Sequence, residues 1–238
     1  MIFAMGMGNG VDEGNGVTPP SAVGVRRGWA ARLFAWSLAH ADAEQHRLYG
    51  DRKRRLLGQI EGAGAAPVVV EIGPGAGPNA RHLAPSTRWV CVEPNVHFHA
   101  RLRRAAAAHG LDLELVAGTA EALPLADGAA DAVVSTLVLC SVHDVRQSLA
   151  EVRRVLRPGG RFVFVEHVAA PAGTTLARLQ AALRRPWGWF ADGCRPDRET
   201  EHAIREAGFA AVEVERFRAP LGLAAPHIAG VAVSPAEG

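Results

Sequence analysis

The chain has 238 residues, of which 48% are hydrophobic and 21% are charged, as expected for an ordinary globular protein with one large core. The formal net charge is +2, and no run of Lys and Arg alternates with aromatic residues, which argues against a nucleic-acid partner. No run of about eighteen apolar residues and no secretory signal occurs, so we expect no transmembrane segment and no export.

The cysteine content indicates the redox compartment. Cys91, Cys140 and Cys194 are widely spaced and form no CxxC pair. This pattern predicts neither a disulfide framework nor a metal site, so we expect a reducing, cytoplasmic location.

The N-terminal part divides into two segments. Residues 1–25 are rich in glycine, proline and small side chains, which predicts a disordered leader. Residues 26–66 predict a helical cap, with one helix over Trp29–Tyr49 and a short one over Asp51–Ile60. The first helix could instead lie on a lipid surface, because arginines flank its apolar face. That face consists of Trp29, Leu33 and Trp36.

Residues 67–238 form the main domain, in which apolar strands alternate with helical segments. This alternation predicts an α/β fold: a doubly wound, mostly parallel, seven-stranded sheet covered on both faces. The expected strands are Val68–Ile72, Trp89–Val92, Leu113–Val116, Ala132–Thr136, Phe162–Val165, Ala211–Phe217 and Ile228–Val233. The expected helices are Asn79–Leu83, Val96–Ala108, Val145–Leu156, Thr174–Arg185 and Arg198–Ala207.

A glycine-rich turn follows the first predicted strand, at the carboxyl edge where open α/β sheets bind ligands. Its glycines are Gly73, Gly75 and Gly77, whereas a dinucleotide fingerprint would place the third glycine at the position of Pro78. Glu71 stands two residues before the turn, and an acid there suits a cation better than a pyrophosphate. The turn therefore predicts a positively charged ligand.

The spacing Glu71-x-Gly73-x-Gly75-x-Gly77 resembles the first motif of class I S-adenosylmethionine-dependent methyltransferases. Glu93 ends the second strand, where an acid can accept both ribose hydroxyls. "GTAEALPLADGAADAVVS" (118–135) and "EVRRVLRPGGRFVFVEH" (151–167) resemble later motifs of the ubiquinone/menaquinone-type members, although Thr119 replaces their usual aspartate. The resemblance implies S-adenosylmethionine as cofactor, bound by Glu71, Gly73, Pro74, Gly75, Gly77, Glu93, Pro94, Thr119, Ala120, Glu121, Thr136 and Leu137.

A finer resemblance points to the acceptor. "STLVLCSV" (135–142), "VEHVAA" (165–170), "DGC" (192–194), "RET" (198–200) and "PHIAGVAV" (226–233) are similar to segments of microsomal thiol S-methyltransferases and their bacterial relatives. The microsomal members carry a membrane-anchoring apolar stretch at the N-terminus, and we expect none in this chain. The resemblance implies a small, rather apolar acceptor, such as a thiol. Methylation at O, N or C of a quinone-type metabolite or a natural product remains open.

Several residues are candidates for the acceptor side. His143 and His167 follow predicted strands and are candidate bases, as is His227, but each could equally be a loop histidine bonded to backbone. Asp192 could pair with one of them or cap a helix. Cys140 is expected to be a small buried hydrophobe, and Cys194 could line the acceptor pocket. The aromatic group Trp187, Trp189 and Phe190 could form the pocket wall or belong to the core.

Two other functions are considered. An NAD-dependent oxidoreductase would need a Tyr-x-x-x-Lys pair, and Tyr49 with Lys53 has that spacing but precedes the sheet. A non-catalytic binding module is the second alternative, because Thr119 and the absence of an unmistakable base weaken the enzyme reading.

Overall fold

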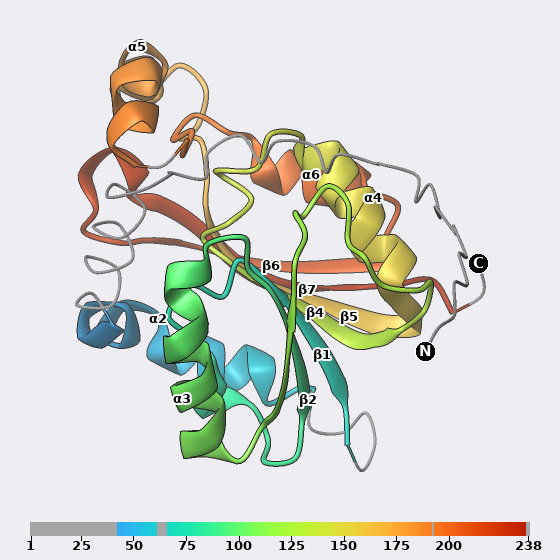
Figure 1. The fold of residues 1–238 in the computed structure, drawn as a ribbon. Helices are drawn as coiled ribbons and strands as arrows, with labels where there is room; N and C mark the ends of the chain where they lie inside the picture. The colour runs from blue at the N-terminus through green and yellow to red at the C-terminus, as the bar shows by residue number, and fades with distance from the viewer. Residues whose placement is uncertain (1–41, 61–65, 192, 237–238) are drawn as a thin grey trace, which may run out of the picture.

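In the computed structural model, the structure describes residues 42–60, 66–191 and 193–236. The predicted leader and the Trp29 face lie outside these residues. The described chain confirms the predicted α/β class, with a twisted seven-stranded sheet between helical layers (Figure 1).

The sheet has the order β3-β2-β1-β4-β5-β7-β6. β1 to β5 run parallel, and β7 is inserted antiparallel between β5 and β6. The chain extends from β1 to β3 on one side and then returns to place β4 on the other side of β1, so the switch point lies at β1. The strands are β1 (Val68–Ile72), β2 (Arg88–Val92), β3 (Asp112–Val116), β4 (Ala130–Thr136), β5 (Leu156–His167), β6 (Ala211–Arg218) and β7 (Pro226–Val233).

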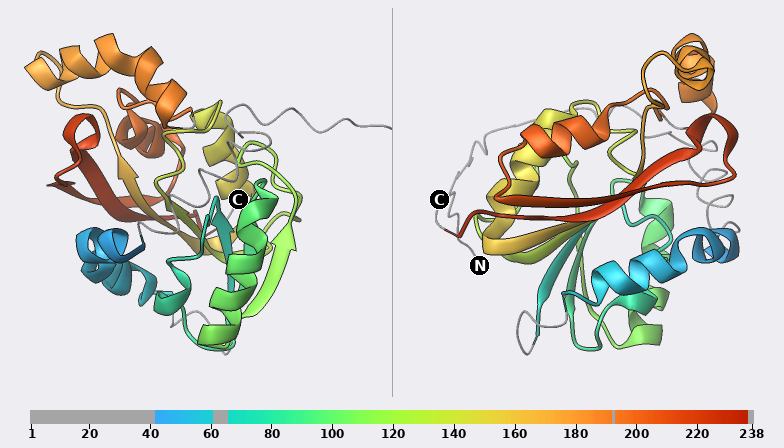
Figure 2. Two further views of the ribbon diagram at one scale, coloured as in Figure 1. Left: turned by 60° about the vertical axis from the view of Figure 1, so that its left-hand side comes forward. Right: turned by 180° about the vertical axis from the view of Figure 1, so that it is seen from behind.

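Helices cover both faces of the sheet (Figure 2). α2 (Asp42–Leu57) and α3 (His99–His109) pack on one face, and α4 (Val145–Val155) and α6 (Thr200–Glu206) pack on the other. α5 (Thr175–Phe190) lies outside both layers. Short 3-10 helices occur at Ala80–His82, Val96–Phe98 and Gly222–Ala224.

Alternation along the strands explains the two cores. Val69 of β1 joins the cluster under α2 and α3, whereas its neighbours Val70 and Ile72 join the cluster under α4 and α6. Successive side chains of a strand point to opposite faces, so one apolar run serves both layers. Because β1, β2, β4 and β5 run parallel, their carboxyl ends lie along one edge of the sheet.

The predicted elements differ from the structure most clearly at three places. A single helix, α2, runs through Gly50 where two helices were expected, because Tyr49 and Leu56 are buried against the sheet. That burial outweighs the roughly 1 kcal/mol cost of a helical glycine. The expected helix Asn79–Leu83 shortens to the 3-10 turn Ala80–His82. β5 begins at Leu156 and passes through the Pro-Gly-Gly segment, with a register shift opposite Ala130–Ala132.

Within the described residues, no helix combines the length and apolar character needed to cross a membrane.

Candidate active site

The glycine turn after β1 is fixed to its neighbour by a hydrogen bond from the Gly73 amide to the Val92 carbonyl, at 3.0 Å. Gly75 and Gly77 both have positive φ, at 58° and 84°. A Cβ at Gly77 would lie 3.1–3.2 Å from side chains of the α2–α3 core, whereas one at Gly75 would meet no atom of the described residues within 4 Å. Gly77 thus serves packing, and Gly75 leaves room for a ligand to approach the backbone.

Glu93 faces this turn from the end of β2. Its Oε2 accepts a hydrogen bond from the Gly75 amide at 3.0 Å, and its Oε1 accepts one from the Asn95 amide at 2.8 Å. A carboxylate offers about four lone-pair sites, so each oxygen can still accept a hydroxyl. Pro94, beside Glu93, is exposed.

Glu71 lies beneath the turn and is 1% exposed. Its two oxygens accept hydrogen bonds from the Asn79 amide and the Trp89 indole, each at 2.8 Å. The Asn79 amide also donates to the Thr136 hydroxyl at 3.0 Å, which ties β1 to β4. Burial raises the pKa of Glu71 to about 7, against the two hydrogen bonds and the positive charge of Lys53. Glu71 therefore braces the turn from below, and Pro74 above it is also buried.

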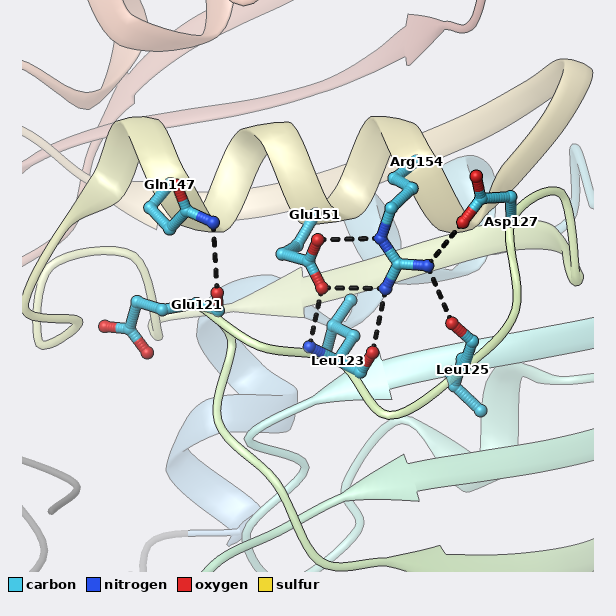
Figure 3. Close-up of polar contacts among 7 residues, drawn as sticks. All are labelled: Glu121, Leu123, Leu125, Asp127, Gln147, Glu151 and Arg154. Atoms are coloured by element: carbon cyan, nitrogen blue, oxygen red, sulfur yellow. Dashed lines mark hydrogen bonds and ion pairs between the residues drawn. The ribbon is translucent and has the colours of Figure 1, made fainter. Parts of the chain in front are cut away.

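The loop after β3 is held on α4 by an arginine–glutamate pair (Figure 3). The Arg154 guanidinium donates to the carbonyls of Leu123 and Leu125 at 2.8 and 2.7 Å and to Asp127 at 2.7 Å. Glu151 accepts from Arg154 and from the Leu123 amide. This role was not predicted from the sequence, although Glu and Arg three residues apart on one helix face indicate such a pair.

Thr119, Ala120 and Glu121 begin this loop. Thr119 is half-buried and pairs with Ala122, and Ala120 is buried. The Glu121 carboxylate accepts from the His143 amide at 2.7 Å, so it organises the β4–α4 loop, while the Glu121 carbonyl accepts from the Gln147 side chain (Figure 3).

Backbone strain marks the end of β4. Leu137 has a φ of 58°, which is unusual for a residue with a side chain. Its amide donates to the Val165 carbonyl at 2.9 Å, and the next amide, of Val138, donates to the buried carboxylate of Glu166 at 3.2 Å. A Cβ at Gly73 would lie 2.8 Å from the Val138 side chain. The segment after β4 is thus in direct contact with the glycine turn.

A sulfur–imidazole cluster occupies the same edge, beyond β4 and β5. His167 ends β5, and its Nε2 lies 3.0 Å from the Cys194 sulfur, which also accepts from the Trp187 indole at 3.2 Å. Ligand atoms of Cys140, His167 and Cys194 all lie within 4.8 Å of one another. Hydrogen bonds from Cys140 and His167 lower the pKa of Cys194, and the contact with Cys194, together with burial, raises that of Cys140.

The other predicted acceptor-side residues do not join this cluster, although the His227 ring packs edge-on against the His167 ring, with the centroids 6.1 Å apart. His143 is exposed on the β4–α4 loop. His227 is buried with both ring nitrogens engaged, by the Tyr49 hydroxyl at 2.9 Å and the Ala225 carbonyl at 3.0 Å, and burial lowers its pKa to about 4. Trp189 is 75% exposed, so it does not belong to the core. Asp192 and the Phe190 side chain lie outside the described residues.

Known proteins resemble this chain over most of its length. A model of the methyltransferase domain matches residues 70–164. The human thiol S-methyltransferase TMT1B is 39% identical over 208 residues, covering 84% of this chain and 85% of the relative. Human TMT1A is 38% identical over 210 residues, covering 85% and 86%.

More distant relatives support the same chemistry class and fold. The ubiquinone/menaquinone biosynthesis C-methyltransferase UbiE of Caulobacter vibrioides is 29% identical over 210 residues, covering 76% of this chain and 81% of the relative. A crystal structure of an S-adenosylmethionine-dependent methyltransferase from Thermotoga maritima superimposes with a TM-score of 0.61 at 21% identity, covering 85% and 97%. These similarities overturn the oxidoreductase alternative. The hydroxyl of Tyr49, the tyrosine which that alternative requires, is hydrogen-bonded to the buried His227. The chain belongs to the family of the thiol S-methyltransferases and is an S-adenosylmethionine-dependent methyltransferase.

Proposed function

We propose that the enzyme transfers the methyl group of S-adenosylmethionine to the sulfur of a small, rather apolar thiol. The single observation that carries this proposal is that two groups of residues lie in contact along the carboxyl edge of the sheet. The glycine turn and Glu93 form one half, the Cys140–His167–Cys194 cluster forms the other, and the segment containing Val138 joins them.

The cofactor half fits an adenosyl sulfonium. The room at Gly75 lets a ligand approach the backbone, and Glu93 can accept ribose hydroxyls. Glu71 acts from beneath the turn, and the backbone of Thr119–Glu121, held by Arg154, would border the adenine. The remaining contributors that we propose are Gly73, Pro74, Gly77, Pro94, Thr136 and Leu137.

The acceptor half fits a sulfur nucleophile. Of the candidate bases predicted from the sequence, His167 is the one whose ring contacts a sulfur atom, and the residue is 5% exposed. Bound S-adenosylmethionine supplies an electrophilic methyl group, and the protein must align the acceptor with it and exclude water. A thiol has an ordinary pKa of about 8.5, so a modest lowering at the cluster would supply the thiolate at neutral pH. The free cysteines also lead us to propose a reducing, cytoplasmic setting.

A direct test is incubation of the purified enzyme with methyl-labelled S-adenosylmethionine and a panel of small thiols, phenols, quinones and amines. The expected result is label in one or more apolar thiols, with an equal amount of S-adenosylhomocysteine released. The Gly75→Val variant gives the background level of labelling, because the valine side chain would fill the space through which the cofactor approaches the backbone. Label in a phenol, quinone or amine but in no thiol would refute the thiol acceptor, and label nowhere would support a non-catalytic binding module.

A further inference from the structure

The cluster at the end of β4 and β5 has the composition of a metal site. Cys140, His167 and Cys194 are 2%, 5% and 7% exposed. Their ligand atoms come from three separate segments, yet all lie within 4.8 Å of one another, and no other such group occurs in the described part of the chain. We propose that these residues bind a zinc ion, contrary to the expectation from cysteine spacing, and that its fourth coordination position receives the acceptor sulfur. The second part rests on the proposed thiol methylation.

The distances suit a tetrahedral ion. Zinc binds cysteine sulfur at about 2.3 Å and histidine nitrogen at about 2.0–2.1 Å, which puts tetrahedral ligand atoms about 3.5–3.8 Å apart. The His167 Nε2 and Cys194 sulfur are 3.0 Å apart, and the widest separation is at most 4.8 Å. Side-chain shifts of about 1 Å or less would thus complete the geometry. Among the described residues the buried His167 Nδ1 has no hydrogen-bond partner, and either ring nitrogen of a histidine can serve as a zinc ligand.

The backbone holds the three segments together independently of any ion. The Arg195 amide donates to the Cys140 carbonyl at 3.0 Å, and the Arg198 carbonyl accepts from the Ala169 amide at 2.9 Å. The buried Arg198 side chain also donates to the Leu139 carbonyl at 3.0 Å. These bonds bring the loop carrying Cys194 onto the loops after β4 and β5, so the ligands are preorganised.

The charges balance in a buried setting. A divalent ion with two thiolates and a neutral imidazole has no net charge, which removes most of the cost of burying it. The Trp187 indole donates to the Cys194 sulfur at 3.2 Å, as an outer donor does to a coordinating thiolate. The guanidinium of Arg198 lies nearby and would offset the extra negative charge of an incoming thiolate.

The ion would activate the acceptor. Three protein ligands and one open position characterise catalytic zinc sites. On binding at that position, the acceptor thiol would release its proton to solvent and become a thiolate. The thiolate sulfur would form the new bond to the methyl carbon as the sulfonium–carbon bond breaks, and the departing sulfur keeps the electron pair. The neutral thioether is a poorer ligand than a thiolate and would leave.

The test is metal content and cobalt spectroscopy on the full chain, prepared under reducing conditions without chelator. We expect about one zinc ion per chain. The Cys140→Ser and Cys194→Ser variants should bind zinc at least about tenfold more weakly. Cys91→Ala is the matched control, because Cys91 is a buried cysteine outside the cluster. Circular dichroism will verify that each variant is folded.

The wild-type protein alone also decides the proposal. Cobalt(II) bound in place of zinc should show thiolate charge-transfer bands and tetrahedral d–d bands, and mercaptoethanol should shift both if a fourth position is open. The proposal is overturned if zinc is absent after supplementation, if zinc content is equal in the serine variants, or if Cys140 and Cys194 form a disulfide. Labelled thiol product without bound metal would overturn the zinc site and leave the thiol reaction intact. Bound zinc without any labelled thiol would overturn the thiol reaction and leave the zinc site intact.

Discussion

The carboxylate of Glu93 and the amide of Gly75 are hydrogen-bonded at 3.0 Å, which brings the end of β2 against the turn that follows β1. A ligand bound at the switch point would therefore contact both groups at once. The two residues define the position of the proposed adenosyl site, and the cluster around His167 marks the side from which we propose that the acceptor arrives.

The glycines of the turn should respond differently to alanine. Gly77→Ala places a Cβ 3.1–3.2 Å from three core side chains at a φ of 84°, so we expect a loss of about 2–4 kcal/mol in the free energy of unfolding. Gly75→Ala has no such contact and should lose about 1–2 kcal/mol from backbone strain alone. Urea denaturation measures both.

Gly159 provides the control for strain, because its φ is 71° and its Cβ would likewise meet no atom within 4 Å in the part of the chain that the structure describes. Gly159→Ala should match Gly75→Ala in stability. Equal losses in all three variants would contradict the packing role of Gly77.

Arg154 should anchor the loop after β3. Arg154→Leu removes the donors to Leu123, Leu125 and Asp127, so we expect a loss of about 1–3 kcal/mol in the free energy of unfolding. Hydrogen exchange should also accelerate in residues 118–129. Arg146→Leu is the matched control on the same helix. The Arg146 guanidinium pairs with Glu206 on the surface, so its loss should cost less than about 1 kcal/mol. Unchanged exchange in the Arg154 variant would show that the loop is held by other contacts.

The buried acid under the turn predicts a pH dependence. The pKa of Glu71 rises from 4.5 to about 7 because of burial, so the folded state binds its proton more tightly than the unfolded state. The contribution of Glu71 to stability is therefore most favourable below about pH 4.5 and falls as the pH rises to about 7.

Glu71→Gln removes this titration. The free energy of unfolding of the variant minus that of the wild type should increase between about pH 4.5 and 7, by up to about 3 kcal/mol, and stay level above about pH 8. Denaturation curves at several pH values measure the difference. A difference that is constant with pH would mean that Glu71 has an ordinary pKa.

Local patterns predicted the sheet and the edge that carries the site. Apolar runs ending at Ile72, Val92 and Val165 predicted the strand ends, and glycine spacing predicted the turn, because both depend on backbone preferences of adjacent residues. The positions of His143 and His227 could not be ranked in this way. Their exposure or burial depends on loops and on α2, which contribute contacts from distant parts of the chain.

The sulfur–imidazole cluster shows the same limit. Cys140 and Cys194 are far apart in sequence, and no short motif links them to His167. Their approach depends on tertiary hydrogen bonds such as that from Arg195 to Cys140. The run through Gly50 in α2 was also unpredictable from propensity, since packing of Tyr49 against the sheet decides it.

The most direct measurement for the cofactor site is calorimetric titration of S-adenosylmethionine into the wild type, Gly75→Val, Glu93→Ala and the control Gly159→Val, each verified as folded. We expect about one equivalent to bind to the wild type and to the control, with binding abolished in the Gly75 and Glu93 variants. Undiminished binding by both site variants would place the cofactor away from the edge between β1 and β2 and contradict the proposed site.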